Sequence, residues 1–229
     1  MTLLEHLGEL RSRLVKASAA VLVATAFSFI FANRLVEILS VPIGGKEALQ
    51  AVEVTENIGV FMRVSLISGI VLAMPVIIYQ LIRFIVPGLT REERRYLWIV
   101  VPSASLLFLT GVAFAYFVML RAAIPFLISV LDIPSRPRPQ SYFSFVGRLM
   151  LWIGISFETP LILAFLARLG IITPQTLRKN RKYAVVLIAV VAAAITPTAD
   201  PVNMLLAMAP LLLLYELGVF LSRLTYRPR

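Results

Sequence analysis

The sequence lacks the residues on which most enzymes and metalloproteins depend. It contains no cysteine, and its only histidine is His6. These absences exclude a disulfide framework, a thiolate metal site and a histidine cluster within one chain. The chain also has no HExxH pattern, no nucleophile elbow and no phosphate-binding glycine loop. We therefore expect no catalytic residues, no cofactor and no metal site.

Charge is also scarce, at 15% of residues, whereas 59% are hydrophobic and the mean hydropathy is +0.90. A water-soluble domain of 229 residues could not hide that much apolar surface. Long apolar runs between short charged stretches predict an all-α polytopic protein with one transmembrane domain, residues 1–229. The net charge of +10 comes without a soluble basic domain, so we expect the lipid bilayer as partner and no nucleic acid.

Six apolar runs predict six membrane helices. They cover approximately residues 15–32, 64–82, 97–120, 149–167, 184–195 and 204–221. Residues 1–14 form an amphipathic segment, which we expect to lie along the cytoplasmic membrane surface. The fifth run has only 12 residues, so helices five and six are expected to be short and to thin the bilayer locally. The alternative is that flanking polar residues extend both helices and nothing is thinned.

The positions of basic residues predict the orientation. Fifteen lysines and arginines lie on the side of the termini and seven on the other side, so both termini are expected in the cytoplasm. Prolines within the spans predict bent helices and a cupped bundle. The alternative is that they are ordinary membrane-helix prolines. They are Pro75, Pro102, Pro160 and Pro210.

Glu158 lies at the centre of the 19-residue apolar run between Arg148 and Arg168. A carboxyl group near the bilayer midplane is costly, so it should face protein or a wet cavity. One interpretation is a polar spot where a partner or substrate meets the helix. The alternative is a packing role, in which a protonated Glu158 satisfies a backbone carbonyl freed by Pro160.

Acids on the predicted cytoplasmic side also allow two interpretations. Glu9, Glu92 and Glu93 could form local salt bridges, for example Glu9 with Arg13. Alternatively, these carboxylates could capture guanidinium groups of an incoming peptide, because arginine presents a planar fork that two oxygens can bind.

Five motifs resemble, in order and nearly end to end, the TatC component of the twin-arginine protein translocase. They are HLGELRSRL, FIVPGLTREERR, SFETPLIL, GIITPQTLRKNRKYA and ITPTADPVNMLLAMAPLLLLYELGVF. The resemblance implies a six-helix receptor for twin-arginine signal peptides in the cytoplasmic (inner) membrane. With TatA- and TatB-like single-span partners it would export folded proteins, driven by the proton motive force. Self-association in a larger complex is expected, since six spans enclose no wide pore.

The resemblance also implies roles for individual residues. Positions that match signal-peptide recognition are Glu9, Arg11, Phe84 and Glu93. Pro42 matches a structural position in the first outer loop, and Glu158 matches a membrane-buried polar contact. Thr196 and Asn203 match positions that meet partner helices. The SRPRPQ stretch departs from the family pattern by adding positive charge to the outer loop.

Two rival functions remain open at this point. A small proton-coupled secondary transporter could use Glu158 as its coupling acid. That class often shows inverted repeats, and none is recognisable between residues 1–115 and 116–229. An intramembrane enzyme is the second rival.

Overall fold

The computed structural model describes residues 3–85, 91–129, 136–196 and 201–226, except for the side chains of residues 3–4, 91–98 and 202–203. Within these residues every regular element is a helix. The chain divides into two compact units, residues 1–106 with 136–144 and residues 107–135 with 145–229. The predicted all-α membrane fold is confirmed.

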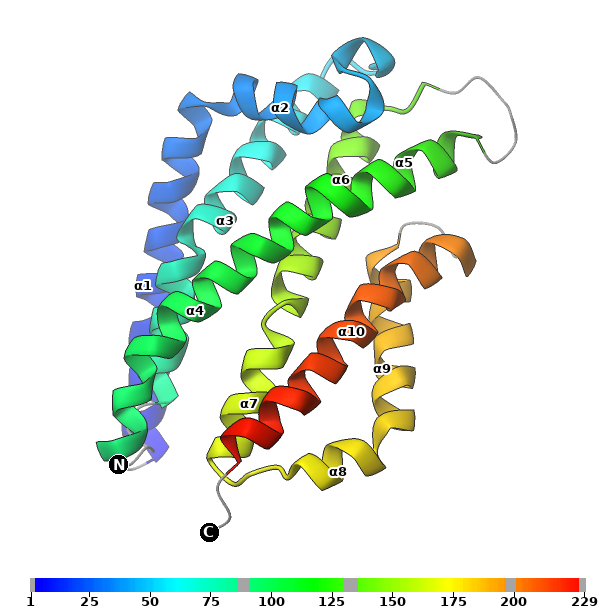
Figure 1. Cartoon of the computed structure of the whole chain (residues 1–229). Coiled ribbons are helices and arrows are strands. Elements are labelled where there is room, and N and C mark those ends of the chain that lie inside the picture. The colour runs from blue at the N-terminus through cyan, green and yellow to red at the C-terminus, as the bar shows by residue number, and fades with distance from the viewer. Residues whose placement is uncertain (1–2, 86–90, 130–135, 197–200, 227–229) are drawn as a thin grey trace. The chain divides into compact units, whose positions relative to one another are not determined.

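The first unit is built on two long antiparallel helices, α1 (Leu3–Ile30) and α3 (Glu56–Ile85). Between them lie α2 (Ala32–Ser40) and two 3-10 turns, η1 (Val41–Ile43) and η2 (Lys46–Ala48). The first part of α4 (Arg91–Phe114) and the start of α6 (Pro139–Ser156) complete the unit. Figure 1 shows α1 and α3 side by side.

Small residues let α1 and α3 approach closely. A Cβ atom added to Gly69 of α3 would lie 2.6 Å from the Cα atom of Thr25 on α1, which no side-chain rotation could relieve. Close backbone approach at small residues drives helix association in lipid, where the hydrophobic effect contributes little between helices. The rings of Phe29 and Phe61 contact each other in a tilted arrangement beyond this crossing, with ring centroids 5.5 Å apart. The two helices therefore form the rigid scaffold of the first unit.

The predicted boundary near residue 14 is absent, because α1 is one continuous helix of 28 residues. The charged start and the apolar run share one helical periodicity, and no proline or glycine interrupts them between residues 9 and 30. Residues 3–14 of the predicted amphipathic segment are thus continuous with the apolar run in one helix. This continuity carries Glu9 on the same helix that packs against α3.

The second unit contains the end of α4, a π-helical turn η4 (Ala115–Met119), α5 (Leu120–Ser129) and the rest of α6. It continues through α7 (Thr159–Arg168), α8 (Pro174–Lys179), α9 (Arg181–Ile195) and α10 (Pro201–Thr225). Helix α10 packs along α7, where Gly218 faces Pro160 and Leu163, and the Thr225 hydroxyl donates to Ala164 O at 3.0 Å. Figure 1 shows α8 joining the ends of α7 and α9.

Five helical stretches within the described residues are long and apolar enough to cross a membrane. They are Glu5–Ile30, Glu56–Ile85, Ile99–Ser129, Pro139–Arg168 and Met204–Thr225. The fifth predicted helix, α9, is short at 15 residues, whereas α10 has 25 residues and exceeds the 18-residue run that predicted it. Helical rise makes them roughly 22 and 37 Å long. Of the two helices predicted to be short, only α9 is short.

Candidate functional site

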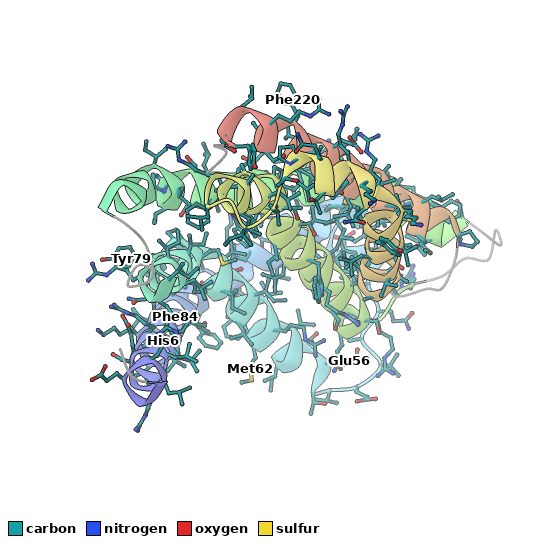
Figure 2. The ribbon with its side chains drawn as sticks, turned by 90° about the horizontal axis from the view of Figure 1, so that it is seen from below. His6, Glu56, Met62, Tyr79, Phe84 and Phe220 are labelled. Carbon is teal, nitrogen blue, oxygen red and sulfur yellow. The ribbon has the colours of Figure 1, made fainter. Side chains whose placement is uncertain are left out.

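The start of α1 and the end of α3 form what we call the Glu9 end of the first unit. The two helices run antiparallel, so residues early in α1 meet residues late in α3. His6 and Phe84 stack with ring centroids 4.4 Å apart and an interplanar angle of 22°, and Figure 2 shows them together. Phe84 is half-buried while His6 is exposed. An aromatic surface thus lies about one helical turn from Glu9.

Glu9 and Arg13 form a half-buried ion pair on α1. Arg13 Nη2 lies 3.1 Å from Glu9 Oε1, and the two side chains are only 19% and 18% exposed. Arg13 Nη1 also donates to Gln80 Oε1 on α3, at 3.3 Å. The local salt bridge considered for Glu9 is therefore present, and α3 helps to hold it.

This pair is incompletely satisfied. Within the described residues, Glu9 Oε2 and Arg13 Nε are both buried and have no hydrogen-bond partner. A buried polar atom without a partner costs about 1–3 kcal/mol. The arrangement therefore holds a carboxylate with one buried, unpaired oxygen, about one helical turn from an aromatic surface.

Two other predicted recognition residues belong to the first unit. Arg11 lies exposed on α1, between Glu9 and Arg13 in sequence. Glu93 falls in the first turn of α4, but its side chain lies outside the described residues. The structure thus brings Glu9 and Phe84 to one end of the α1–α3 pair, and leaves the contacts of Glu93 untested.

The opposite end of the first unit carries a set of ionic contacts that we call the loop clasp, made by Glu53, Glu56 and Arg138. Arg138 Nη2 lies 2.7 Å from Glu53 Oε1, and Arg138 Nε donates to Glu56 Oε1 at 2.5 Å. Glu56 is fully buried, and its Oε2 accepts from Val52 N at 3.2 Å. Figure 2 labels Glu56 at the start of α3. The clasp fastens residues 136–138 to the loop before α3.

Neighbouring bonds reinforce this attachment. Tyr142 OH donates to Leu39 O at 2.8 Å, Gln50 N donates to Pro137 O at 3.2 Å, and Arg63 donates to Ser144. The positive charge that SRPRPQ adds is therefore partly neutralised within the unit.

Hydrogen bonds to Glu53 and Glu56 raise the pKa of Arg138 above its ordinary value. A raised arginine pKa means that its stabilisation is fully present below the unfolded-state pKa and is lost only as pH rises through the folded-state value. Both values lie above physiological pH, so the Arg138 guanidinium stays charged wherever the protein functions.

Pro42 lies half-buried in η1, the turn that follows α2. Its fixed φ suits the first positions of a helical turn. The chain then reverses through Gly44 and Gly45, whose φ angles are +98° and +100°. Residues with side chains rarely adopt such angles, so these glycines allow the loop that carries Lys46.

Glu158 lies in the second unit, at a break between α6 and α7. The break lies inside the single apolar stretch Pro139–Arg168, and Glu158 occupies the position just before α7 without making a side-chain cap. Pro160 stands in the first turn of α7, where its missing N–H costs little. Glu158 is buried, and its Oε1 has no hydrogen-bond partner in the described part of the chain. Glu158 therefore presents a buried carboxyl oxygen whose hydrogen-bonding capacity is unused within the described residues.

The two predicted partner-contact residues flank the α9–α10 connection. Thr196 is half-buried at the end of α9, where its hydroxyl donates to Ala192 O at 3.1 Å and so caps its own helix. Asn203 falls in the first turn of α10, but its side chain lies outside the described residues. Elsewhere in α10, Glu216 forms an ion pair with Arg181 of α9. Glu216 is thus a structural acid that fastens two neighbouring helices.

Some of these residues carry no sequence signal. Glu56 and Arg138 are 82 positions apart, and neither lies in a motif that predicts the other. Gln80 was detectable in principle, because it is an uncharged polar residue inside an apolar run. Among the described residues, no three or more His, Asp or Glu side chains are grouped so as to hold a metal ion.

Comparison with known proteins adds an independent line of support. The family model described as "Sec-independent protein translocase protein (TatC)" matches residues 5–210. The chain is 38% identical to the TatCy protein of Bacillus subtilis, over 99% of this chain and 91% of that protein. It is 38% identical to the TatC protein of Aquifex aeolicus, over 100% of this chain and 98% of that protein.

A solved relative has the same fold. The crystal structure of a twin-arginine translocase receptor, TatC, superposes with a TM-score of 0.86 at 38% identity, covering 97% of this chain and 100% of that one. The family match, the identity over almost the whole length and the structural superposition agree. The chain belongs to the TatC family of Sec-independent protein translocases.

Proposed function

We propose that this protein is the twin-arginine signal-peptide receptor and core subunit of a translocase that exports folded proteins, driven by the proton motive force. The single observation that carries the residue-level proposal is the Glu9 end, where a half-buried carboxylate with one unpaired oxygen lies near the half-buried Phe84 ring. Guanidinium groups bind carboxylates with two parallel bonds, and the apolar stretch of a signal peptide can lie against an aromatic ring.

The proposed recognition site comprises Glu9, Arg11, Phe84 and Glu93. Glu9 and Glu93 would bind the two arginines, and Phe84 would contact the peptide's apolar part. The asymmetry of basic residues favours cytoplasmic termini, which would place the Glu9 end where precursors are synthesised. We place the protein in the cytoplasmic membrane, with both termini inside.

The other predicted residues would serve assembly. The unsatisfied oxygen of Glu158 would accept a hydrogen bond from an inserted signal or partner helix. Thr196 and Asn203 would meet the single-span TatA- and TatB-like partners, and Pro42 would shape the first loop. Several copies would act together, because one chain is too small to enclose a folded cargo. The relatives reported above are translocase proteins, and none supports a proton-coupled transporter or an enzyme.

The proposal is tested by photocrosslinking a twin-arginine precursor to this chain in membrane vesicles. A precursor with two lysines in place of the arginines and the Glu93→Ala variant are compared in parallel. We expect each change to reduce the adduct strongly, because a lysine ammonium cannot form the bidentate pair and alanine removes one carboxylate. Equal adduct in all three samples would refute the assignment of the arginine-binding site.

A further inference from the structure

We propose that Arg13 is a resident competitor for the arginine-binding carboxylate, and that it sets the affinity threshold that a signal peptide must exceed. The inference rests on the proposed function, because it concerns the same Glu9 carboxylate. Its basis is that Glu9 is already bonded to a guanidinium of this chain, Arg13, at 3.1 Å. An incoming arginine offers the same chemical group and therefore competes for the same oxygens.

The geometry indicates a pair that can be exchanged. Arg13 reaches only one oxygen of Glu9, through Nη2 alone, whereas a guanidinium in the preferred arrangement engages both oxygens. Within the described residues, Glu9 Oε2 and Arg13 Nε remain buried and unbonded. These unsatisfied atoms raise the free energy of the resident pair. A ligand that bridges both carboxylate oxygens would have a lower free energy of interaction with Glu9 than the resident pair has.

Gln80 of α3 is the second residue that holds Arg13 in place. Its Oε1 accepts from Arg13 Nη1 at 3.3 Å and comes from α3, not from the helix that carries the pair. An isolated i,i+4 pair on one helix would hold Arg13 only weakly. The contact from α3 keeps Arg13 against Glu9 when no peptide is bound.

Simple competition has a specific thermodynamic consequence. A resident competitor weakens every ligand for the same carboxylate by one common factor, so it lowers the affinities for arginine and lysine pairs equally. The preference for arginine comes from the carboxylates, while Arg13 raises the threshold below which weak ligands are ignored. Removing Arg13 should therefore strengthen both ligands and leave their ratio unchanged.

The test uses the full chain in lipid nanodiscs and two synthetic signal peptides that differ only in an arginine or a lysine pair. In the Arg13→Gln variant we expect both affinities to rise by about three- to tenfold, as expected for loss of one partly screened ion pair. Arg13→Lys should give a smaller rise, because a single ammonium is a weaker occupant. Lys16→Gln, an exposed position on the same helix, removes the same charge and should change little.

Arg13→Gln binding as weakly as Glu9→Gln, or unchanged from the wild type, would overturn the inference. If Arg13→Gln does not fold, Gln80→Leu decides in its place. It keeps the pair but removes its anchor, so it should raise both affinities slightly; no rise would overturn the inference. A wild-type protein without preference for the arginine peptide, together with normal binding by Glu9→Gln, would instead refute the proposed function itself.

Discussion

Replacing Glu9 with glutamine is expected to weaken binding of a twin-arginine peptide by about tenfold to a hundredfold. Glutamine keeps the shape of the side chain and one carbonyl oxygen, but it loses the charge and the second acceptor. A hydrogen bond to a charged group contributes about 1.5–3 kcal/mol, which corresponds to this range of affinity. Titration of the labelled peptide into the nanodisc-embedded chain, followed by fluorescence anisotropy, measures the change.

Glu37→Gln provides the matched control. Glu37 is an exposed acid of the same unit that pairs with Arg34 and Lys46, so its replacement changes the net charge equally. We expect it to leave peptide affinity within about twofold, since exposed ion pairs contribute little. If both variants weaken binding equally, the effect belongs to overall charge and the role assigned to Glu9 is wrong.

The second large effect is expected at the loop clasp. Arg138→Met should lower the melting temperature of the purified protein by about 5 °C or more, because it leaves the fully buried Glu56 carboxylate without its cation. Thermal unfolding followed by circular dichroism in detergent measures this shift. Limited proteolysis should also cut faster near residues 50–55, which the clasp connects to residues 136–138.

Two variants distinguish the effect of breaking the loop clasp from the effect of losing one positive charge. Arg136→Met removes an exposed arginine two residues away and should leave the melting temperature nearly unchanged. The double variant Glu56→Leu with Arg138→Met should recover part of the loss, because removing both partners of a buried pair costs less than removing one. A double variant that melts at or below the temperature of Arg138→Met would contradict the coupling.

The sequence predicted the helical membrane fold well, for a clear physical reason. Spans must be apolar and nearly 20 residues long, and that requirement is visible in any single sequence. The boundaries were less predictable. The run from 149 to 167 predicted one span with a bend at Pro160, but not where each helix ends; α6 ends at Ser156 and α7 begins at Thr159, directly before that proline. Helix α10 begins earlier than its apolar run, at Pro201, which suits a first helical position.

The candidate site was predicted in part. Motif resemblance identified Glu9 and Phe84, and the structure brings both to one end of the α1–α3 pair. The contacts that Gln80 and His6 make there depend on the antiparallel register of two helices, which is set by packing at residues such as Gly69. Pairing over such distances leaves no periodic signal in one sequence. The same applies to Arg138, whose partners lie in the loop before α3 and at the start of α3.

The most direct test of the central claim is to determine which side of the membrane the Glu9 end faces. The chain contains no cysteine, so a thiol reagent can label this chain only at a single introduced cysteine. Ser12→Cys marks the Glu9 end and Thr55→Cys marks the clasp end, and both positions are exposed. With a membrane-impermeant maleimide applied to inverted membrane vesicles, the account predicts labelling of Ser12→Cys and protection of Thr55→Cys. The reverse pattern would place the carboxylate on the wrong side of the membrane and contradict the proposed receptor.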